Sequence, residues 1–463
     1  MAGPHGCRNR AGFHALRGRR KMHGFIVPDA FPGRVKFLPT GAVCGYGAKN
    51  NNPGTTAMFS TLSRPAALGL CVLCAATFTA ITSELAPVGL LLEMARSFHL
   101  NSGQVGMAVS AYALIVAALA VPLTIVTARV NRKRLVLLAL AGYAASNLMG
   151  AFAPSFWLLC VGRAVGGGAH ALLMSIVSAY AAQLVPRRVT GRAISFVFCG
   201  ASFGAVAGVP AAAAIGQFLG WRAALLAAGG LAAVLAVVVM VALPAVATPV
   251  RAARSGLRGS GRAVRDFGVI LTVTTGFFFA HNLVYTYIAP VLVAHGLPQA
   301  TLSLDLLAIG VCSLAGLWGA GQLVDASPRL GMLGAGALLL AGIGLLVGHA
   351  TSGIGSVAAG AVWCAGYAGA IPFFMSGAIR TQATTGDIAG AAVNATSNIG
   401  ILLGSAVGGG LLALHGQGVL APTAIGVGVL CMALVAVSGS AFPTRVVHED
   451  EDLPTPVPAT AGG

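Results

Sequence analysis

Twelve long apolar stretches follow one another between residues 66 and 442, separated by short polar segments. Each stretch has about 18 to 28 residues, and about 20 apolar residues are enough to cross a bilayer as a helix. Because lipid offers the backbone no hydrogen-bond partners, each stretch must be helical. The pattern predicts an all-α membrane protein with twelve transmembrane helices, at residues 66–92, 105–127, 135–153, 156–184, 193–217, 223–246, 267–293, 302–324, 330–350, 353–379, 388–414 and 418–442.

The longest polar segment between two stretches divides the twelve into two sets of six. Comparable signals follow the second and the eighth stretch, at Arg129–Arg134 and Gly321–Arg329, and suggest a duplicated half. The predicted organisation is a basic, disordered extension (1–63), a first six-helix half (64–246), a cytoplasmic central loop (247–266), a second six-helix half (267–442) and an acidic, Pro-rich cytoplasmic tail (443–463).

The N-terminal extension has no apolar core of the length that a signal peptide requires. One interpretation is a disordered cytoplasmic tail. The preferred interpretation is a product of start-codon choice, because Met58 stands shortly before the first apolar stretch. Residues 1–57 are then expected to be dispensable.

Charged residues make up 8% of the chain, against about 25% in soluble domains, which excludes a soluble protein. The net charge of +17 is unevenly distributed, because the loops on one side of the predicted bundle hold most of the basic residues. These are Arg129, Arg132, Lys133, Arg134, Arg187, Arg188, Arg192, Arg251, Arg254, Arg258, Arg262, Arg265, Arg329 and Arg380. The loops on the other side hold only Arg96 and Arg222. The positive-inside rule then places both termini in the cytoplasm, and nucleic acid is not an expected partner.

One carboxylate, Glu84, lies deep inside the first apolar stretch. Low dielectric disfavours the charged form of a buried acid, so Glu84 could take a proton on one side of the membrane and release it on the other. One charge crossing about 100 mV gains about 2.3 kcal/mol, which is an adequate driving force. The alternative is a structural acid that never changes protonation. Pro87 frees a backbone carbonyl near Glu84 and is expected to kink the helix.

The fourth stretch carries two further ionisable residues, Arg163 and His170, seven positions apart and therefore on one face. Histidine titrates near physiological pH, so His170 could share the proton with Glu84 or bind sugar hydroxyls. A satisfied structural histidine is the alternative. Arg163 could snorkel toward the extracellular headgroups or pair with an acid from another stretch.

Polar and aromatic residues in the second half could hydrogen-bond to and stack on a sugar or a flat drug. With His170, the candidates for substrate binding are His281, Asn282, Tyr285, Tyr367, Asn394 and Asn398. Aromatic residues at the membrane interface explain some of them equally well. His281 and Asn398 are preferred, because sites between transporter repeats lie near the midplane.

Several short motifs occur in order across the first half. They are Thr82–Leu90, Ser97–Leu100, Gln104–Gly106, Arg163–His170, Gly208–Pro210 and Gly220–Arg222. Through these motifs the chain resembles the major facilitator superfamily over residues 64–445. Within it, the chain is similar to the drug:proton antiporter-1 group, which includes bacterial sugar-efflux and arabinose-efflux permeases.

This resemblance implies a secondary transporter of the inner membrane that exports a small sugar or an amphipathic drug in exchange for protons, by alternating access. It implies that Glu84 faces the central cavity, that Arg163 takes part in proton coupling and that His170 lines the cavity. We expect a monomer without cofactor or metal, driven by the proton gradient. An uptake symporter of the same fold stays open as an alternative. A non-transporting receptor or an enzyme is disfavoured, since the stretches contain no HExxH or Walker motif.

The loop after the second stretch matches the family's gating motif, G-x-x-x-D-R-x-G-R-K, at Arg129, Arg132 and Lys133, whereas Thr124 and Ala128 replace its first Gly and its Asp. Asn131 replaces the second Gly, and Asn tolerates the left-handed backbone better than most residues. The second-half copy keeps its acid as Asp325, where we expect any cytoplasmic gate lock.

The fifth stretch contains glycines four positions apart, Gly200, Gly204 and Gly208, followed by Pro210. Such a series forms a flat ridge that allows another helix to approach closely. It resembles the antiporter signature and therefore favours export over uptake, although small-residue ridges are also ordinary packing.

Overall fold

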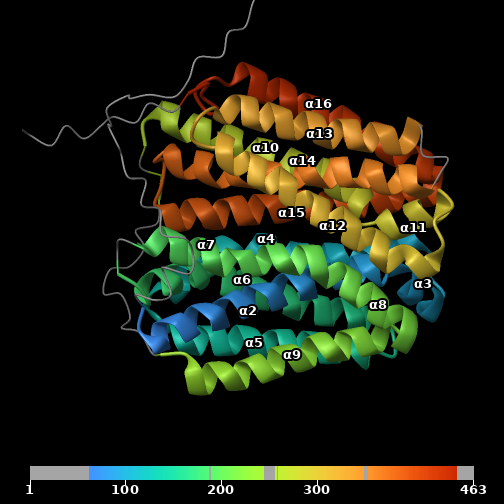
Figure 1. Ribbon diagram of the computed structural model, residues 1–463, viewed down its shortest axis with the longest axis horizontal. Helices are drawn as coiled ribbons and strands as arrows, with labels where there is room; N and C mark the ends of the chain where they lie inside the picture. The colour runs from blue at the N-terminus through green and yellow to red at the C-terminus, as the bar shows by residue number, and fades with distance from the viewer. Residues whose placement is uncertain (1–61, 187–188, 245–255, 258, 349–352, 446–463) are drawn as a thin grey trace, which may run out of the picture. The chain divides into compact units, whose positions relative to one another are not determined.

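The computed structural model describes residues 62–186, 189–244, 256–257, 259–348 and 353–445. Within these ranges every regular element is a helix, and twelve helical segments are long and apolar enough to span a membrane (Figure 1). The predicted all-α membrane fold is therefore confirmed. Most of the predicted N-terminal extension and acidic tail, and half of the predicted central loop, lie outside the described residues.

The long helices follow the predicted stretches closely. They are α2 (Arg64–Gly89), α4 (Ser102–Val126), α5 (Arg132–Ala151), α6 (Phe156–Gln183), α7 (Thr190–Phe203) with α8 (Val209–Leu219), α9 (Trp221–Ala242), α10 (Gly261–Tyr285), α12 (Leu302–Leu323), α13 (Pro328–Gly348), α14 (Gly353–Arg380), α15 (Gly386–His415) and α16 (Leu420–Val437). Shorter elements are the helices α3 (Leu91–Phe98) and α11 (Ile288–Ala294), the 3-10 turns η1 (Thr127–Arg129), η4 (Gln299–Thr301) and η5 (Gln417–Val419), and the π-helical turn η3 (Gly204–Gly208).

At two of the helices that begin earlier than predicted, α5 and α10, a preceding polar side chain caps the helix. Ser260 accepts a hydrogen bond from the backbone N–H of Ala263, so α10 begins at Gly261. Residues 261–266, predicted as the end of the central loop, are therefore helical. Asn131 has φ −57° and ψ 121°, so it does not adopt the left-handed backbone that Asn tolerates. Its side chain instead accepts from the N–H of Arg134 and caps α5.

The glycine ridge of the fifth span packs against α2. A Cβ at Gly200 would collide with the carbonyl oxygen of Cys74, and one at Gly204 would lie 2.8 Å from the carbonyl oxygen of Phe78. The expected close approach is confirmed. The π-helical turn η3 ends two residues before Pro210, whose missing N–H leaves the carbonyl of Val206, within η3, without its α-helical partner.

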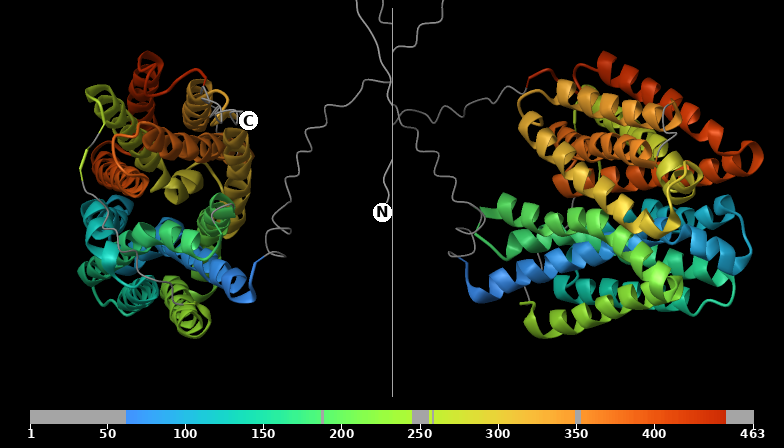
Figure 2. Two further views of the ribbon diagram at one scale, coloured as in Figure 1. Left: turned by 90° about the vertical axis from the view of Figure 1, so that its left-hand side faces the viewer. Right: turned by 45° about the vertical axis from the view of Figure 1, so that its right-hand side comes forward.

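The helices gather in two groups that correspond to the two halves of the chain, α2–α9 and α10–α16 (Figures 1 and 2). The most extensive contact between the halves joins α4 to α15. There the hydroxyl groups of Ser110 and Ser405 are 2.7 Å apart, and the Tyr287 hydroxyl donates to the carbonyl oxygen of Ser405 at 2.6 Å. Near one end of this contact, Gly103 and Gly409 bring the two backbones together, since a Cβ on either would collide with the other backbone.

Large apolar side chains stand exposed on many of the long helices, among them Trp157, Phe218, Val241 and Trp318. Soluble monomers rarely expose apolar surface on this scale. Together with the length of the helices, this surface is what a bundle surrounded by lipid requires, and the chain is a multi-pass membrane protein.

Candidate functional site

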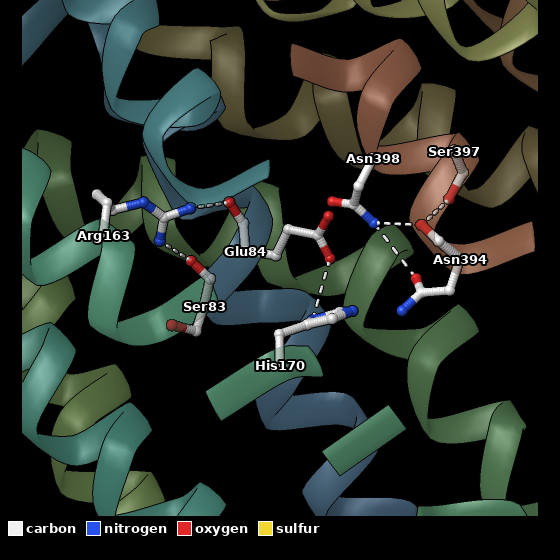
Figure 3. Close-up of polar contacts among 7 residues, drawn as sticks. All are labelled: Ser83, Glu84, Arg163, His170, Asn394, Ser397 and Asn398. Carbon is white, nitrogen blue, oxygen red and sulfur yellow. Dashed lines mark hydrogen bonds and ion pairs between the residues drawn. The ribbon is translucent and has the colours of Figure 1, made fainter. Parts of the chain in front are cut away.

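The candidate site begins at a break in the hydrogen bonding of α2. Pro87 lacks an N–H, so the carbonyl oxygen of Ser83, four residues earlier, has no partner within the helix. Arg163 of α6 occupies this position: one guanidinium nitrogen donates to the Ser83 carbonyl at 2.6 Å and another donates to the Glu84 carbonyl at 2.7 Å (Figure 3). The carbonyl that Pro87 was expected to free is therefore used to hold a cation.

The guanidinium of Arg163 is enclosed by the first half. The residue is 5% exposed, its third donor reaches the carbonyl oxygen of Ala108 at 3.4 Å, and its central carbon lies 4.3 Å from the ring centre of Tyr112. Arg163 therefore does not extend toward the headgroups. Three carbonyl dipoles and an aromatic face stabilise its charge.

The carboxyl group of Glu84 points away from Arg163 and toward His170 (Figure 3). An oxygen of Glu84 lies 3.5 Å from Nδ1 of His170, and the two side chains are 12% and 3% exposed. The Tyr112 ring meets the His170 ring edge-on, with centres 5.7 Å apart. The prediction that Arg163 and His170 share a face is confirmed, because both reach the same segment of α2.

The second half contributes two asparagines of α15 to the same region. The Asn398 amide nitrogen donates to the backbone oxygen of Asn394 at 2.9 Å and to its side-chain oxygen at 3.3 Å. Figure 3 shows the Glu84 carboxyl between His170 on one side and Asn398 on the other. The Asn398 side-chain oxygen is buried and has no hydrogen-bond partner.

An aromatic cluster lies deeper in the second half. The ring of His281 stacks on Tyr367 with centres 3.5 Å apart and on Tyr285 at 4.7 Å, and Trp363 lies 5.2 Å from it. Nδ1 of His281 and the indole nitrogen of Trp363 are buried without a hydrogen-bond partner. Tyr367 is near enough to Glu84 to interact with it electrostatically. The cluster is therefore a stack of rings with two buried, unpartnered ring nitrogens.

Asn282, also predicted to bind substrate, lies elsewhere. Its amide nitrogen donates to the Phe278 carbonyl of its own helix at 3.0 Å, and its Cβ packs near Gly404 of α15. Its side chain is thus engaged in packing α10 against α15, and the structure does not bring it together with the Glu84 group.

The predicted gating residues lie apart from this group, near the ends of helices. Lys133 donates to the Met240 carbonyl at 2.8 Å and so satisfies a carbonyl in the last turn of α9. Arg132 is buried, whereas Arg129 is exposed. Asp325 is 3.9 Å from Arg380, which also donates to the Val324 carbonyl. This pair joins elements of the second half, so it does not lock the two halves together here.

Two contributors to the site were not predicted. Tyr112 provides the aromatic face over Arg163, and Asn147 of α5 donates to the Ser83 hydroxyl at 2.8 Å. The sequence carried no specific signal for either, beyond a polar or aromatic residue within an apolar stretch. The Ser83 carbonyl could have been found, because the missing N–H of Pro87 identifies the residue four positions earlier.

The arrangement can bind and release a proton inside the protein. Glu84 is the acid, the His170 ring and the Asn398 amide lie beside it, and the charge of Arg163 is held by the backbone of the same helix turn. Among the residues that the structure describes, no three His, Cys, Asp or Glu side chains gather as metal ligands would.

Comparison with known proteins identifies the family. Residues 68–391 match the model of the Major Facilitator Superfamily. The chain is 30% identical to a chloramphenicol efflux pump of Mycobacterium tuberculosis over 372 residues, which is 76% of this chain and 89% of that protein. It is also 30% identical, over 254 residues, to a "probable sugar efflux transporter" of Helicobacter pylori, covering 54% of this chain and 63% of that protein.

Solved structures show the same fold at low identity. The human organic anion transporter MFSD10 is 16% identical with a TM-score of 0.61, over 81% of this chain and 100% of that structure. A bacterial homologue of the human lysosomal transporter Spinster, in an inward-facing and unoccupied conformation, is 16% identical with a TM-score of 0.60, over 83% of this chain and 99% of that structure.

Proposed function

The chain belongs to the major facilitator superfamily and is a membrane transporter rather than an enzyme, and on this premise we propose that it exports a small sugar or an amphipathic drug across the inner membrane in exchange for protons. The observation that carries the proposal is the Glu84 carboxyl, placed inside the bundle beside His170 and turned toward the second half. Ionisable groups within membrane helices are costly and mark ion or proton pathways.

Coupling requires that the protonated and ionised forms of Glu84 interact differently with the two conformations of the protein. Glu84 is suited to this task because its backbone is anchored in the first half through Arg163, while its carboxyl group points toward α15 of the second half. Rocking of the halves would change which groups of the second half the Glu84 carboxyl contacts. Its first-half neighbours, Arg163 and His170, would move with it.

The substrate class is proposed from the chemistry of the second half. Stacked rings around His281 provide faces for a flat drug or for the apolar face of a sugar, and the unpartnered nitrogens of His281 and Trp363 can hydrogen-bond to oxygens of either. The names of the two relatives, a chloramphenicol pump and a sugar efflux transporter, support the same two classes.

The test measures movement of radiolabelled chloramphenicol and L-arabinose in proteoliposomes with an imposed pH gradient. We expect Glu84→Gln to abolish transport driven by the gradient while the protein stays folded. Asp305→Asn, which removes a partly exposed carboxylate at the start of α12, is the control and should transport normally. Gradient-driven transport at the wild-type rate by Glu84→Gln would refute the proton role.

The direction of the gradient separates the two transport modes. An antiporter accumulates the probe in the compartment from which protons flow, whereas a symporter accumulates it in the compartment that protons enter. Accumulation together with protons would overturn export and favour uptake. Failure of the wild-type protein to move either probe would overturn the proposed substrate class.

A further inference from the structure

The amide oxygen of Asn398 is an unpaired acceptor in the middle of the protein. The residue is 2% exposed, and this oxygen has no partner. Buried polar atoms are paired in the large majority of cases, so an orphan acceptor needs an explanation. The orientation of the amide is set by its nitrogen, which donates to two oxygens of Asn394 one turn earlier. The oxygen must therefore face the other way, toward Glu84 (Figure 3).

None of the groups that surround Glu84 donates a hydrogen bond to the Asn398 amide oxygen. Glu84 interacts with five residues of other helices: Arg163 and His170 of α6, Tyr112 of α4, Tyr143 of α5 and Tyr367 of α14. The guanidinium donates to three backbone carbonyls, and none of the others donates to Asn398. An ionised Glu84 offers acceptors alone, whereas a protonated one offers an O–H donor.

We propose that Asn398 is the hydrogen-bond acceptor for the protonated Glu84 carboxyl, so that proton loading links the first half to the second. When Glu84 is ionised, a carboxylate oxygen and an amide oxygen face one another without a proton between them, and the link is absent. Because the bond joins the two halves, it stabilises this arrangement of the halves only when Glu84 is protonated, and proton loading thereby biases the conformational equilibrium. The inference rests on the proposed function, because it assumes that Glu84 exchanges a proton.

Asn398 was predicted as a substrate contact, whereas here it is the hydrogen-bond acceptor of the Glu84 carboxyl. Asn394 acts as a positioning residue, since its oxygens hold the Asn398 amide nitrogen and thereby aim the amide oxygen. The neighbouring Ser397 donates to the Asn394 carbonyl within the same helix and reaches no group of the first half in Figure 3. Ser397 therefore supplies a matched control on the same turn.

The test is infrared difference spectroscopy of the full-length protein in lipid, titrated from alkaline to acidic pH without substrate. A band of a protonated carboxyl that is absent in Glu84→Gln belongs to Glu84. Donation to an amide oxygen lowers the C=O stretching frequency of a carboxylic acid. We therefore expect the band to move to higher frequency in Asn398→Leu and to stay in place in Ser397→Ala. Asn398→Val, a smaller apolar replacement, gives the same reading if the leucine variant does not fold.

The outcomes separate the inference from the function on which it rests. A Glu84 band whose frequency is unchanged in both Asn398 variants would overturn the hydrogen bond and leave Glu84 as the proton site. Absence of any band that Glu84→Gln removes, at every pH, would overturn the proton role itself, and the inference with it.

Discussion

At the end of the bundle that the charge pattern assigns to the extracellular side, one residue joins the two halves. Arg96 of α3 donates to the side-chain oxygen of Gln299 at 2.8 Å, and the Gln299 amide nitrogen donates to Glu93 of α3 at 3.3 Å. Gln217 of α8 donates to the backbone oxygen of Gln299 at 2.8 Å. Since Gln299 belongs to the second half and the others to the first, outward opening must break all three bonds.

The Gln299→Ala variant removes the two side-chain bonds and keeps the backbone one. A hydrogen bond contributes about 0.5 to 1.5 kcal/mol net, and pairs near solvent fall at the low end. Since Arg96 is exposed, the two bonds together stabilise the closed state of this end by about 1 to 2 kcal/mol, which Gln299→Ala removes. That corresponds to a rise of about 5- to 30-fold in the equilibrium constant for opening at this end.

Double electron–electron resonance can measure this shift, after replacement of the nine native cysteines. Spin labels at Phe152 and Leu414, both exposed and on different halves, report the separation at this end. We expect the long-distance population to grow in Gln299→Ala. Gln417→Ala is the control, because Gln417 of η5 donates to Pro290 within the second half. An unchanged distance distribution in Gln299→Ala would refute the reasoning.

Two further predictions concern packing and helix ends. Gly200→Val should lower the melting temperature of the purified protein sharply, because the valine side chain would collide with the Cys74 carbonyl. Gly230→Val is the control and should lower the melting temperature little, because no atom lies within 4 Å of a Cβ at that position. Equal losses of melting temperature would contradict the ridge packing. Lys133→Met should destabilise by about 0.5 to 1.5 kcal/mol in denaturant unfolding, because the Met240 carbonyl loses its donor. Arg129→Met, at an exposed position, is its control, and an equal effect of both would refute the capping role.

Most of the fold could be predicted from hydropathy, because a spanning segment must be long, apolar and helical wherever it packs. The differences arose where polar side chains act on the backbone: Ser260 extends α10 toward the N-terminus, and Asn131 caps α5. A short-range signal was present in both cases, since serine and asparagine are common N-caps.

The candidate site was predictable only in part. Glu84, Arg163 and His170 are unusual in apolar stretches, and the structure brings them together. Among the asparagines the sequence offered no such distinction. Asn282 and Asn398 both lie in apolar stretches, and each donates its amide nitrogen to the carbonyl four residues earlier. Yet Asn282 packs near Gly404 of α15, whereas Asn398 faces Glu84.

By itself the sequence determined the twelve spans and the one carbonyl that Pro87 leaves unpaired, because hydropathy and backbone hydrogen bonding act over neighbouring residues. Only the tertiary structure decided that Arg163, from another helix, binds that carbonyl, and that Asn398 of the opposite half faces Glu84. Those pairings depend on how helices distant in the chain rotate and pack, which no local pattern specifies.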